Sequence, residues 1–142
     1  MIPELVDGVL PVGIHRATFD ELTEVFGWTT QRMRLIEGFK QGVEDLRIGG
    51  CKDVWLDGSF VTNKEVPGDF DACWDPTPVD LSAVDPVLLD MSDGRKAQKQ
   101  KYGGEFMPNV IEGGSGMFFV EFFQQDRNGN PKGILHFRIE DQ

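Results

Sequence analysis

Two small residues and two acidic residues have the types and the spacing that phosphate chemistry needs. Gly58 and Ser59 directly follow a predicted buried strand at residues 52–57, and Asp69 and Asp71 follow the next loop. Residues two apart in a strand point to the same face, so we expect both carboxylates to project together. Such a pair can hold Mg²⁺ or Mn²⁺ with the phosphates of a nucleotide, which a Gly-Ser turn can approach closely. The pattern favours phosphoryl or nucleotidyl transfer.

This arrangement resembles the nucleotidyltransferase superfamily, which has a polymerase-beta-like fold. Members carry Gly-Ser or Gly-Gly at the end of a strand and Asp-x-Asp or Asp-x-Glu on the next strand, and Gly58, Ser59, Asp69 and Asp71 match these positions. The resemblance implies a third carboxylate on a later strand. Asp90 is the best candidate by position, and the weaker candidates are Asp75 and Asp80.

The whole chain also looks like a small bacterial and phage family of uncharacterised nucleotidyltransferase-like proteins, through residues 10–18, 55–62 and 68–75. At 15.9 kDa it has no room for an extra helical domain and is similar to minimal nucleotidyltransferases, many of which are antitoxins beside a ribonuclease toxin. The resemblance implies transfer of a nucleoside monophosphate from a nucleoside triphosphate (NTP) to a protein, RNA or small hydroxyl acceptor. A toxin is then a plausible protein partner. The implied metal ligands are Asp69, Asp71 and Asp90, and the implied phosphate cradle is Gly58 and Ser59.

Two other interpretations use the same residues. The chain can be an inactive protein of the same fold that acts as an antitoxin, inhibitor or phage counter-defence factor through its acidic surface. Alternatively, Asp69 tightens a turn, Asp71 is a solvated strand residue, and a lysine from residues 96–101 neutralises them. Asp90 separates these interpretations, because its convergence with Asp69 and Asp71 would favour the enzyme.

Composition narrows the class of protein. With 142 residues, 39% of them hydrophobic and 27% charged, the chain is expected to form one domain over residues 1–142. A net charge of −10 argues against extensive nucleic-acid binding and against adhesion to anionic membranes. Cys51 and Cys73 match no metal-binding spacing and are expected to be free thiols. Without a leader or a spanning apolar segment, we expect a cytoplasmic protein.

The patterning predicts an α+β fold, with N-terminal helices packed on a mixed sheet. A capping box of Thr18 and Glu21 begins the first helix, and a second helix starts after Thr29 or Thr30. Inside the second helix, Gly38 and Gly42 could permit close packing of another backbone. A basic helix face is expected within residues 94–102. Strands are predicted at residues 52–57, 69–75, 86–91 and 134–139, whereas residues 117–125 fit a helix or a strand.

Overall fold

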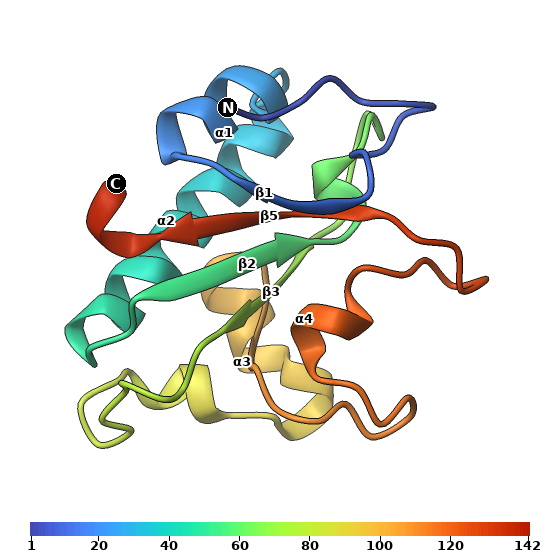
Figure 1. Cartoon of the computed structure of the whole chain (residues 1–142). Helices are drawn as coiled ribbons and strands as arrows, with labels where there is room; N and C mark the ends of the chain where they lie inside the picture. The colour runs from blue at the N-terminus through green and yellow to red at the C-terminus, as the bar shows by residue number, and fades with distance from the viewer.

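A five-stranded mixed sheet with the strand order β1-β5-β2-β3-β4 forms the middle of the molecule (Figure 1). The computed structural model describes residues 1–142. Strand β5 runs parallel to β1 and β3 runs parallel to β4, while β2 is antiparallel to its neighbours β3 and β5. The mixed sheet and its helices confirm the predicted α+β class. The strands are β1 (Gly13–Arg16), β2 (Asp53–Asp57), β3 (Phe70–Trp74), β4 (Gly104–Pro108) and β5 (Gly133–Arg138).

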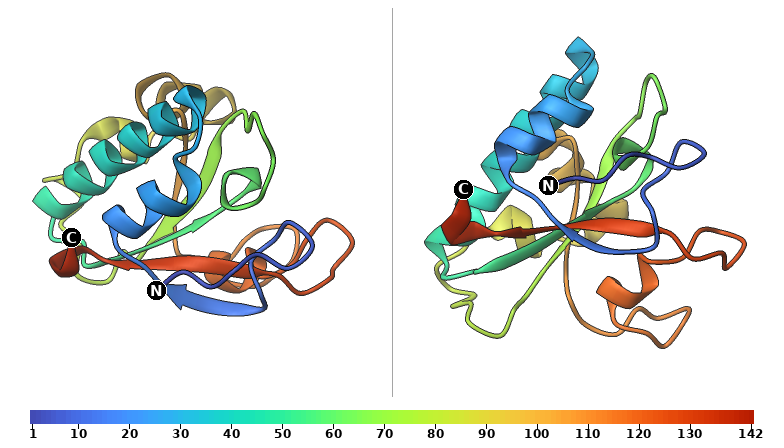
Figure 2. Two further views of the ribbon diagram at one scale, coloured as in Figure 1. Left: turned by 90° about the horizontal axis from the view of Figure 1, so that it is seen from above. Right: turned by 45° about the horizontal axis from the view of Figure 1, so that its top comes forward.

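Helices cover the two faces of this sheet unequally. The long helix α2 and its neighbour α1 lie together on one face (Figure 2), whereas the short α4 lies against the other. The predicted capping box is present, since the Thr18 hydroxyl accepts a hydrogen bond from the Glu21 N–H and the Glu21 carboxylate accepts one from the Thr18 N–H. The elements are α1 (Phe19–Phe26), α2 (Thr30–Ile48), α3 (Ser92–Tyr102) and α4 (Phe119–Phe122), with the 3₁₀ turns η1 (Ser59–Val61), η2 (Pro86–Leu89) and η3 (Ile139–Asp141).

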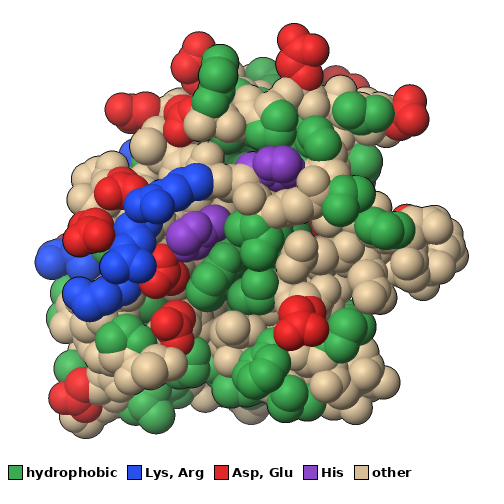
Figure 3. All heavy atoms as spheres, viewed as in Figure 1, with side chains coloured by type: hydrophobic (Ala, Val, Ile, Leu, Met, Phe, Trp, Pro, Cys, Tyr) green, Lys and Arg blue, Asp and Glu red, His purple; other side chains and the backbone are tan.

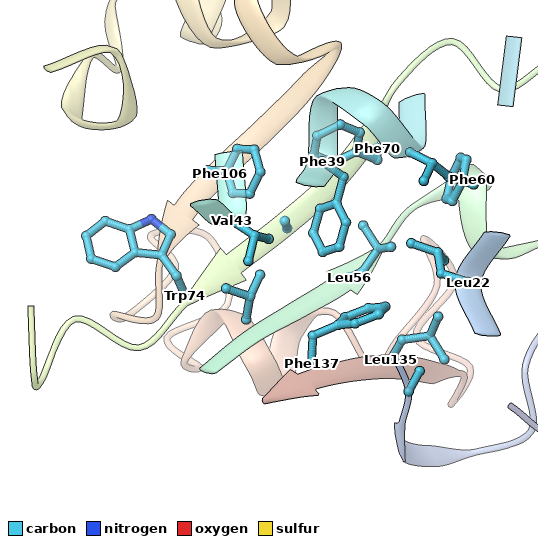
Figure 4. Packing of buried hydrophobic residues seen from close by; sticks show 14 of the residues in the cluster. Leu22, Phe39, Val43, Leu56, Phe60, Phe70, Trp74, Phe106, Leu135 and Phe137 are labelled. Carbon is cyan, nitrogen blue, oxygen red and sulfur yellow. The ribbon is translucent and has the colours of Figure 1, made fainter. Parts of the chain in front are cut away.

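The main core lies between the sheet and the helices α1, α2 and α3. Phe39 of α2 is at its centre (Figure 4), with ring centroids 5.2–6.1 Å from those of Phe19, Phe70, Phe106 and Phe137. Alternation along β3 sends Phe70, Ala72 and Trp74 into this core. The residues between them face the other side of the sheet, where Cys73 packs with Phe123 and Ile134 in a smaller cluster. Asp71 shares that second face.

The two glycines inside α2 serve the close packing that their positions predict. A Cβ atom at Gly38 would lie 1.6 Å from the carbonyl oxygen of Tyr102, at the end of α3. A Cβ atom at Gly42 would lie 2.3 Å from the ring of Phe106, on β4. Helix α2 therefore reaches α3 and β4 only because both positions lack a side chain.

Three elements differ from the sequence-based expectations. Residues 86–91 are not a strand: Pro86–Leu89 form the turn η2, in which the Asp85 carboxylate accepts a hydrogen bond from the Val87 N–H. Strands β1 and β4 were not among the predicted strands. Residues 117–125 contain the short helix α4.

The two cysteines, Cys51 and Cys73, are free and buried. No helix of the structure has the length and apolar character needed to cross a membrane.

Candidate functional site

The Gly58–Ser59 turn begins where β2 ends, and its backbone conformation requires glycine. Gly58 has φ 94° and ψ −178°, a backbone conformation that residues with a Cβ atom rarely adopt. A Cβ atom at this position would also lie 3.0 Å from Oδ2 of Asp71. Ser59 then opens η1, and the Thr62 hydroxyl donates a hydrogen bond to its carbonyl oxygen at 2.5 Å. The turn therefore lies directly against the carboxylate of Asp71.

Carboxylates from three neighbouring strands gather beside this turn. The sheet register places Asp71 of β3 opposite Asp57 of β2 and opposite Glu105 of β4. Asp69 directly precedes β3. Burial, followed by the charges of Glu105, Asp69 and Asp57, raises the pKa of Asp71 to about 6. Burial and the charge of Glu105 also raise the pKa of Asp69.

Two of these four carboxylates have cationic partners of their own. Lys132 Nζ lies 2.5 Å from Oδ1 of Asp57, while Arg95 Nε and Lys99 Nζ lie 3.3 Å and 3.1 Å from the oxygens of Glu105. The carboxylates of Asp69 and Asp71 have no ion-pair partner within 4.0 Å. Asp69 and Asp71 therefore have no direct ion pair. The more distant charges of Lys99 and Lys64 act on Asp69, and that of Lys132 acts on Asp71, but burial and the neighbouring carboxylates outweigh them and keep both pKa values raised.

This donor set fits a hard divalent cation. Carboxylate oxygens are the ligands that Mg²⁺ and Mn²⁺ prefer, and Mg²⁺ commonly binds through one or two carboxylates together with substrate phosphates. Asp69 and Asp71 provide those two groups. Burial is the main cause of the raised pKa of Asp71, and the repulsion from Glu105, Asp69 and Asp57 adds to it; a bound cation would offset that repulsion. No group of three or more His, Cys, Asp or Glu side chains is already arranged as a metal site. Glu105 can join the pair only by exchanging Arg95 or Lys99 for the metal.

The structure does not bring Asp90 to this group. Its carboxylate accepts hydrogen bonds from the Ser92 N–H at 3.0 Å and from the Ser92 hydroxyl at 2.6 Å, which lowers its pKa. Asp75 and Asp80 cap turns in a similar way, through Thr77 and Ser82. Glu105 occupies the neighbouring strand instead. Glu105 was not predicted as a site residue. The sequence signal that could have indicated its strand is the alternation of Glu105, Phe106 and Met107 after a glycine pair.

Arg32 supports the loop that follows the turn, and sequence reasoning missed this role. Its guanidinium is buried and donates hydrogen bonds to the carbonyl oxygens of Phe60 and Thr62, each at 2.7 Å. It also donates to the carbonyl of Lys64 at 2.5 Å and lies 4.5 Å from the ring of Trp28. An arginine inside a helical pattern usually indicates a solvated face, so only the packed structure reveals that it anchors this loop.

The residues 94–102 are only partly a solvated basic face. Asp93, Gly94 and Arg95 have left-handed backbone conformations, with φ values of 51°, 62° and 63°. After this bend, Arg95 and Lys99 both pair with Glu105, while Lys101 pairs with Asp85 and Asp45. Most cations of this segment therefore neutralise acidic groups of the protein itself.

A pocket of about 310 Å³ opens beside Asp71 and Glu105 on the face of the sheet that carries α4. Its polar side chains belong to Asp71, Glu105, Arg95 and Glu112. Its apolar wall consists of Met107, Phe119, Phe122 and Phe123. The site thus combines two carboxylates without a direct ion pair, a glycine-dependent turn and an adjacent pocket with an apolar wall.

Comparison with known proteins identifies a family for this chain but no characterised relative. No curated protein and no solved structure matches this chain. A protein family does match, and the matched segment contains all five strands together with the Gly58–Ser59 turn and the acidic cluster. Because residues 3–138 fit the family described as "Family of unknown function (DUF6932)", the chain belongs to that family.

Proposed function

We propose that the protein is a nucleotidyltransferase that depends on Mg²⁺ or Mn²⁺ and transfers a nucleoside monophosphate from an NTP to a hydroxyl acceptor. One observation carries the proposal. Asp71 has no direct ion pair and lies between the Gly58–Ser59 turn and Glu105 of the adjacent strand, and Asp69, which directly precedes the same strand, has no direct ion pair either. Clustering like charges without partners destabilises a fold, so such a cluster is typical of a site that binds cations.

Each residue of the site has a role in this proposal. Asp69 and Asp71 would hold the metal, which supplies charge neutralisation to the phosphates when it is bound. Gly58 and Ser59 would cradle the β- and γ-phosphates through the backbone and the hydroxyl. Glu105, rather than Asp90, would be the third carboxylate, at the position where the acceptor hydroxyl arrives.

A second function has one observation in its favour. Glu105 is paired with Arg95 and Lys99, an arrangement that satisfies the carboxylate without any metal. A protein with this fold could then bind a partner, such as a toxin, without catalysis. A measurement of NTP binding in the presence of a divalent cation separates the two functions, because only the enzyme requires both.

The test is thermal unfolding with and without each NTP, in Mg²⁺ or Mn²⁺, for the natural chain, Asp71→Asn and Asp90→Asn. A ligand at 100 times its Kd stabilises the folded state by about 2.7 kcal/mol. We expect a metal-dependent shift with at least one NTP that Asp71→Asn abolishes. Asp90→Asn is the matched control and should keep the shift. No shift with any NTP, or a shift that survives in Asp71→Asn, would refute the proposal.

A further inference from the structure

We infer that the pocket between Glu105 and α4 binds the nucleobase of the NTP, and that Glu112 makes this site selective for guanine. This inference rests on the proposed function, because it names the base of that substrate. Three observations support it: the position of the pocket relative to the Gly58–Ser59 turn, the aromatic wall, and a carboxylate in the lining that the backbone holds in place.

The pocket lies on the other side of Asp71 from the Gly58–Ser59 turn. Gly58 follows the end of β2, Asp71 is on the neighbouring strand β3, and Glu105 and Met107 are on β4, the next strand across the sheet. Residues of β3 and β4 line the pocket, and none of the turn does. In an NTP, the α-phosphate joins the nucleoside to the β- and γ-phosphates. With those two phosphates at the turn and the α-phosphate beside Asp71, the nucleoside extends toward β4 and into the pocket.

The apolar wall of the pocket suits a planar base. Phe119, Phe122 and Phe123 have ring centroids 5.9–6.4 Å apart, and Met107 adds a thioether beside them. Hydrophobic side chains reach the surface around α4 (Figure 3), and Phe122 itself is 39% exposed. Every base has a π-face that stacks on aromatic side chains. The wall therefore explains the binding of a base, and the choice among bases needs a polar group.

Glu112 supplies that polar group. One of its carboxylate oxygens accepts a hydrogen bond from the Gly114 N–H at 2.9 Å, and the other accepts one from the Ser115 N–H at 2.7 Å. Hydrogen bonds from Ser115 and Gly114 also lower the pKa of Glu112, so the group is ionised at neutral pH. An ionised carboxylate has about four acceptor sites and no donor, so each oxygen can still accept an N–H from a ligand.

No cation neutralises this carboxylate. Glu112 takes part in none of the ion pairs of the structure. Arg95 is the single cation of the pocket lining, and it pairs with Glu105. Glu112 therefore presents a negative, acceptor-only group to whatever enters the pocket.

Guanine is the base whose edge matches such a group. Its N1–H and its 2-amino group are adjacent donors, so one carboxylate can accept both in a bidentate, charge-assisted pair. Adenine and cytosine place a ring nitrogen acceptor beside the amino group, and uracil places a carbonyl oxygen on each side of its N–H. In each of these bases an acceptor would face the negative oxygens of Glu112, which disfavours the pairing.

The test of the base uses nucleosides, because they carry no phosphate and need no metal. Guanosine, inosine and adenosine are titrated separately into the isotope-labelled protein, and NMR follows the resonances of residues 105–107, 112–115 and 119–123. Inosine differs from guanosine only by the loss of the 2-amino group. We expect saturable shifts at these residues with guanosine, and binding of inosine and adenosine that is weaker by at least about fivefold.

Three variants separate recognition of the edge from stacking. Glu112→Gln should abolish the preference for guanosine over inosine, because an amide has only one acceptor oxygen. Phe122→Ala should weaken both nucleosides by the same factor, because it removes stacking and leaves Glu112 in place. Glu121→Gln is the matched control, since Glu121 is an exposed glutamate of α4 outside the pocket, and it should change neither affinity. Inosine removes one of the same hydrogen bonds from the ligand, so this comparison holds even if Glu112→Gln disturbs its loop.

Three results would overturn the inference: no saturable shifts in the pocket with guanosine, equal binding of guanosine and adenosine or inosine, or loss of the preference in Glu121→Gln. A parallel titration with GTP and ATP in Mg²⁺ reports on the proposed function separately. Equal, metal-dependent binding of GTP and ATP would support the proposed function and overturn the choice of guanine. Guanosine binding in the pocket without metal-dependent binding of GTP would refute the proposed function and leave a guanine site.

Discussion

The carboxyl group of Asp71 makes stability depend on pH in an unusual direction. Its pKa is raised from 3.8 to about 6, so the folded chain holds this proton more tightly than the unfolded chain. The contribution of Asp71 to the free energy of unfolding therefore falls as pH rises from about 4 to about 6, and it is lost above that range. At pH 8 and without metal, we expect Asp71→Asn to be more stable than the natural chain by about 2 kcal/mol. Near pH 4 the two should coincide in urea unfolding.

Asp90 provides the control for this prediction, because its pKa is lowered by hydrogen bonds from Ser92. Such a carboxylate contributes stability above its ordinary pKa, so Asp90→Asn should not stabilise the protein at pH 8. If Asp71→Asn proved less stable than the natural chain at pH 8, the charge of Asp71 would have a favourable partner in the folded state.

Arg32 gives a second prediction at the scale of single residues. Arg32→Met leaves the carbonyls of Phe60, Thr62 and Lys64 without their donor inside the protein, and we expect a loss of about 2–5 kcal/mol in urea unfolding. Amide exchange at residues 59–64 should quicken more than elsewhere. Arg34→Met, on an exposed position of the same helix, should change neither quantity. Equal losses for both variants would show that Arg32 does not anchor the loop.

At the scale of elements, the contact of α2 with α3 and β4 depends on Gly38. In an isolated helix, alanine is favoured over glycine by about 1 kcal/mol. Here the added Cβ atom would meet the Tyr102 carbonyl at 1.6 Å, so α2 and α3 must separate. We expect Gly38→Ala to destabilise the protein by about 1–3 kcal/mol in thermal unfolding. Gly113→Ala, with nothing within 4 Å, is the control and should be neutral.

Elements whose signal is local could be predicted from the sequence, and those that depend on distant partners could not. The helix caps at Thr18 and Thr29 and the apolar runs of β2, β3 and β5 are local signals, and the structure has each element there. Strand β4 is short and follows a glycine pair, so its local signal is weak. It is defined as a strand by its parallel pairing with β3, which lies about thirty residues earlier in the chain. The same reason explains the site. Gly58, Ser59, Asp69 and Asp71 are close in sequence, whereas Glu105 reaches them only through the sheet.

The charge of the whole molecule predicts its behaviour toward nucleic acids. The chain has 24 acidic and 14 basic side chains, and many of its cations pair with its own carboxylates. Binding of proteins to nucleic acids draws largely on cations that replace counterions at the phosphates. In fluorescence anisotropy at about 0.15 M salt, we expect no saturable binding of a labelled RNA or DNA below about 10⁻⁴ M. Tight binding that weakens steeply with added salt would contradict this expectation.

The place of β5 in the sheet has a consequence for how the chain folds during synthesis. This strand lies between β1 and β2, yet Gly133–Arg138 follow every other strand in the chain. While a ribosome is still adding these residues, β1 has no strand to pair with and one edge of β2 remains open. Such unpaired edges invite aggregation, so the nascent chain is exposed to chaperones and to misfolding until its last strand emerges. The sheet is completed only after translation has passed Arg138.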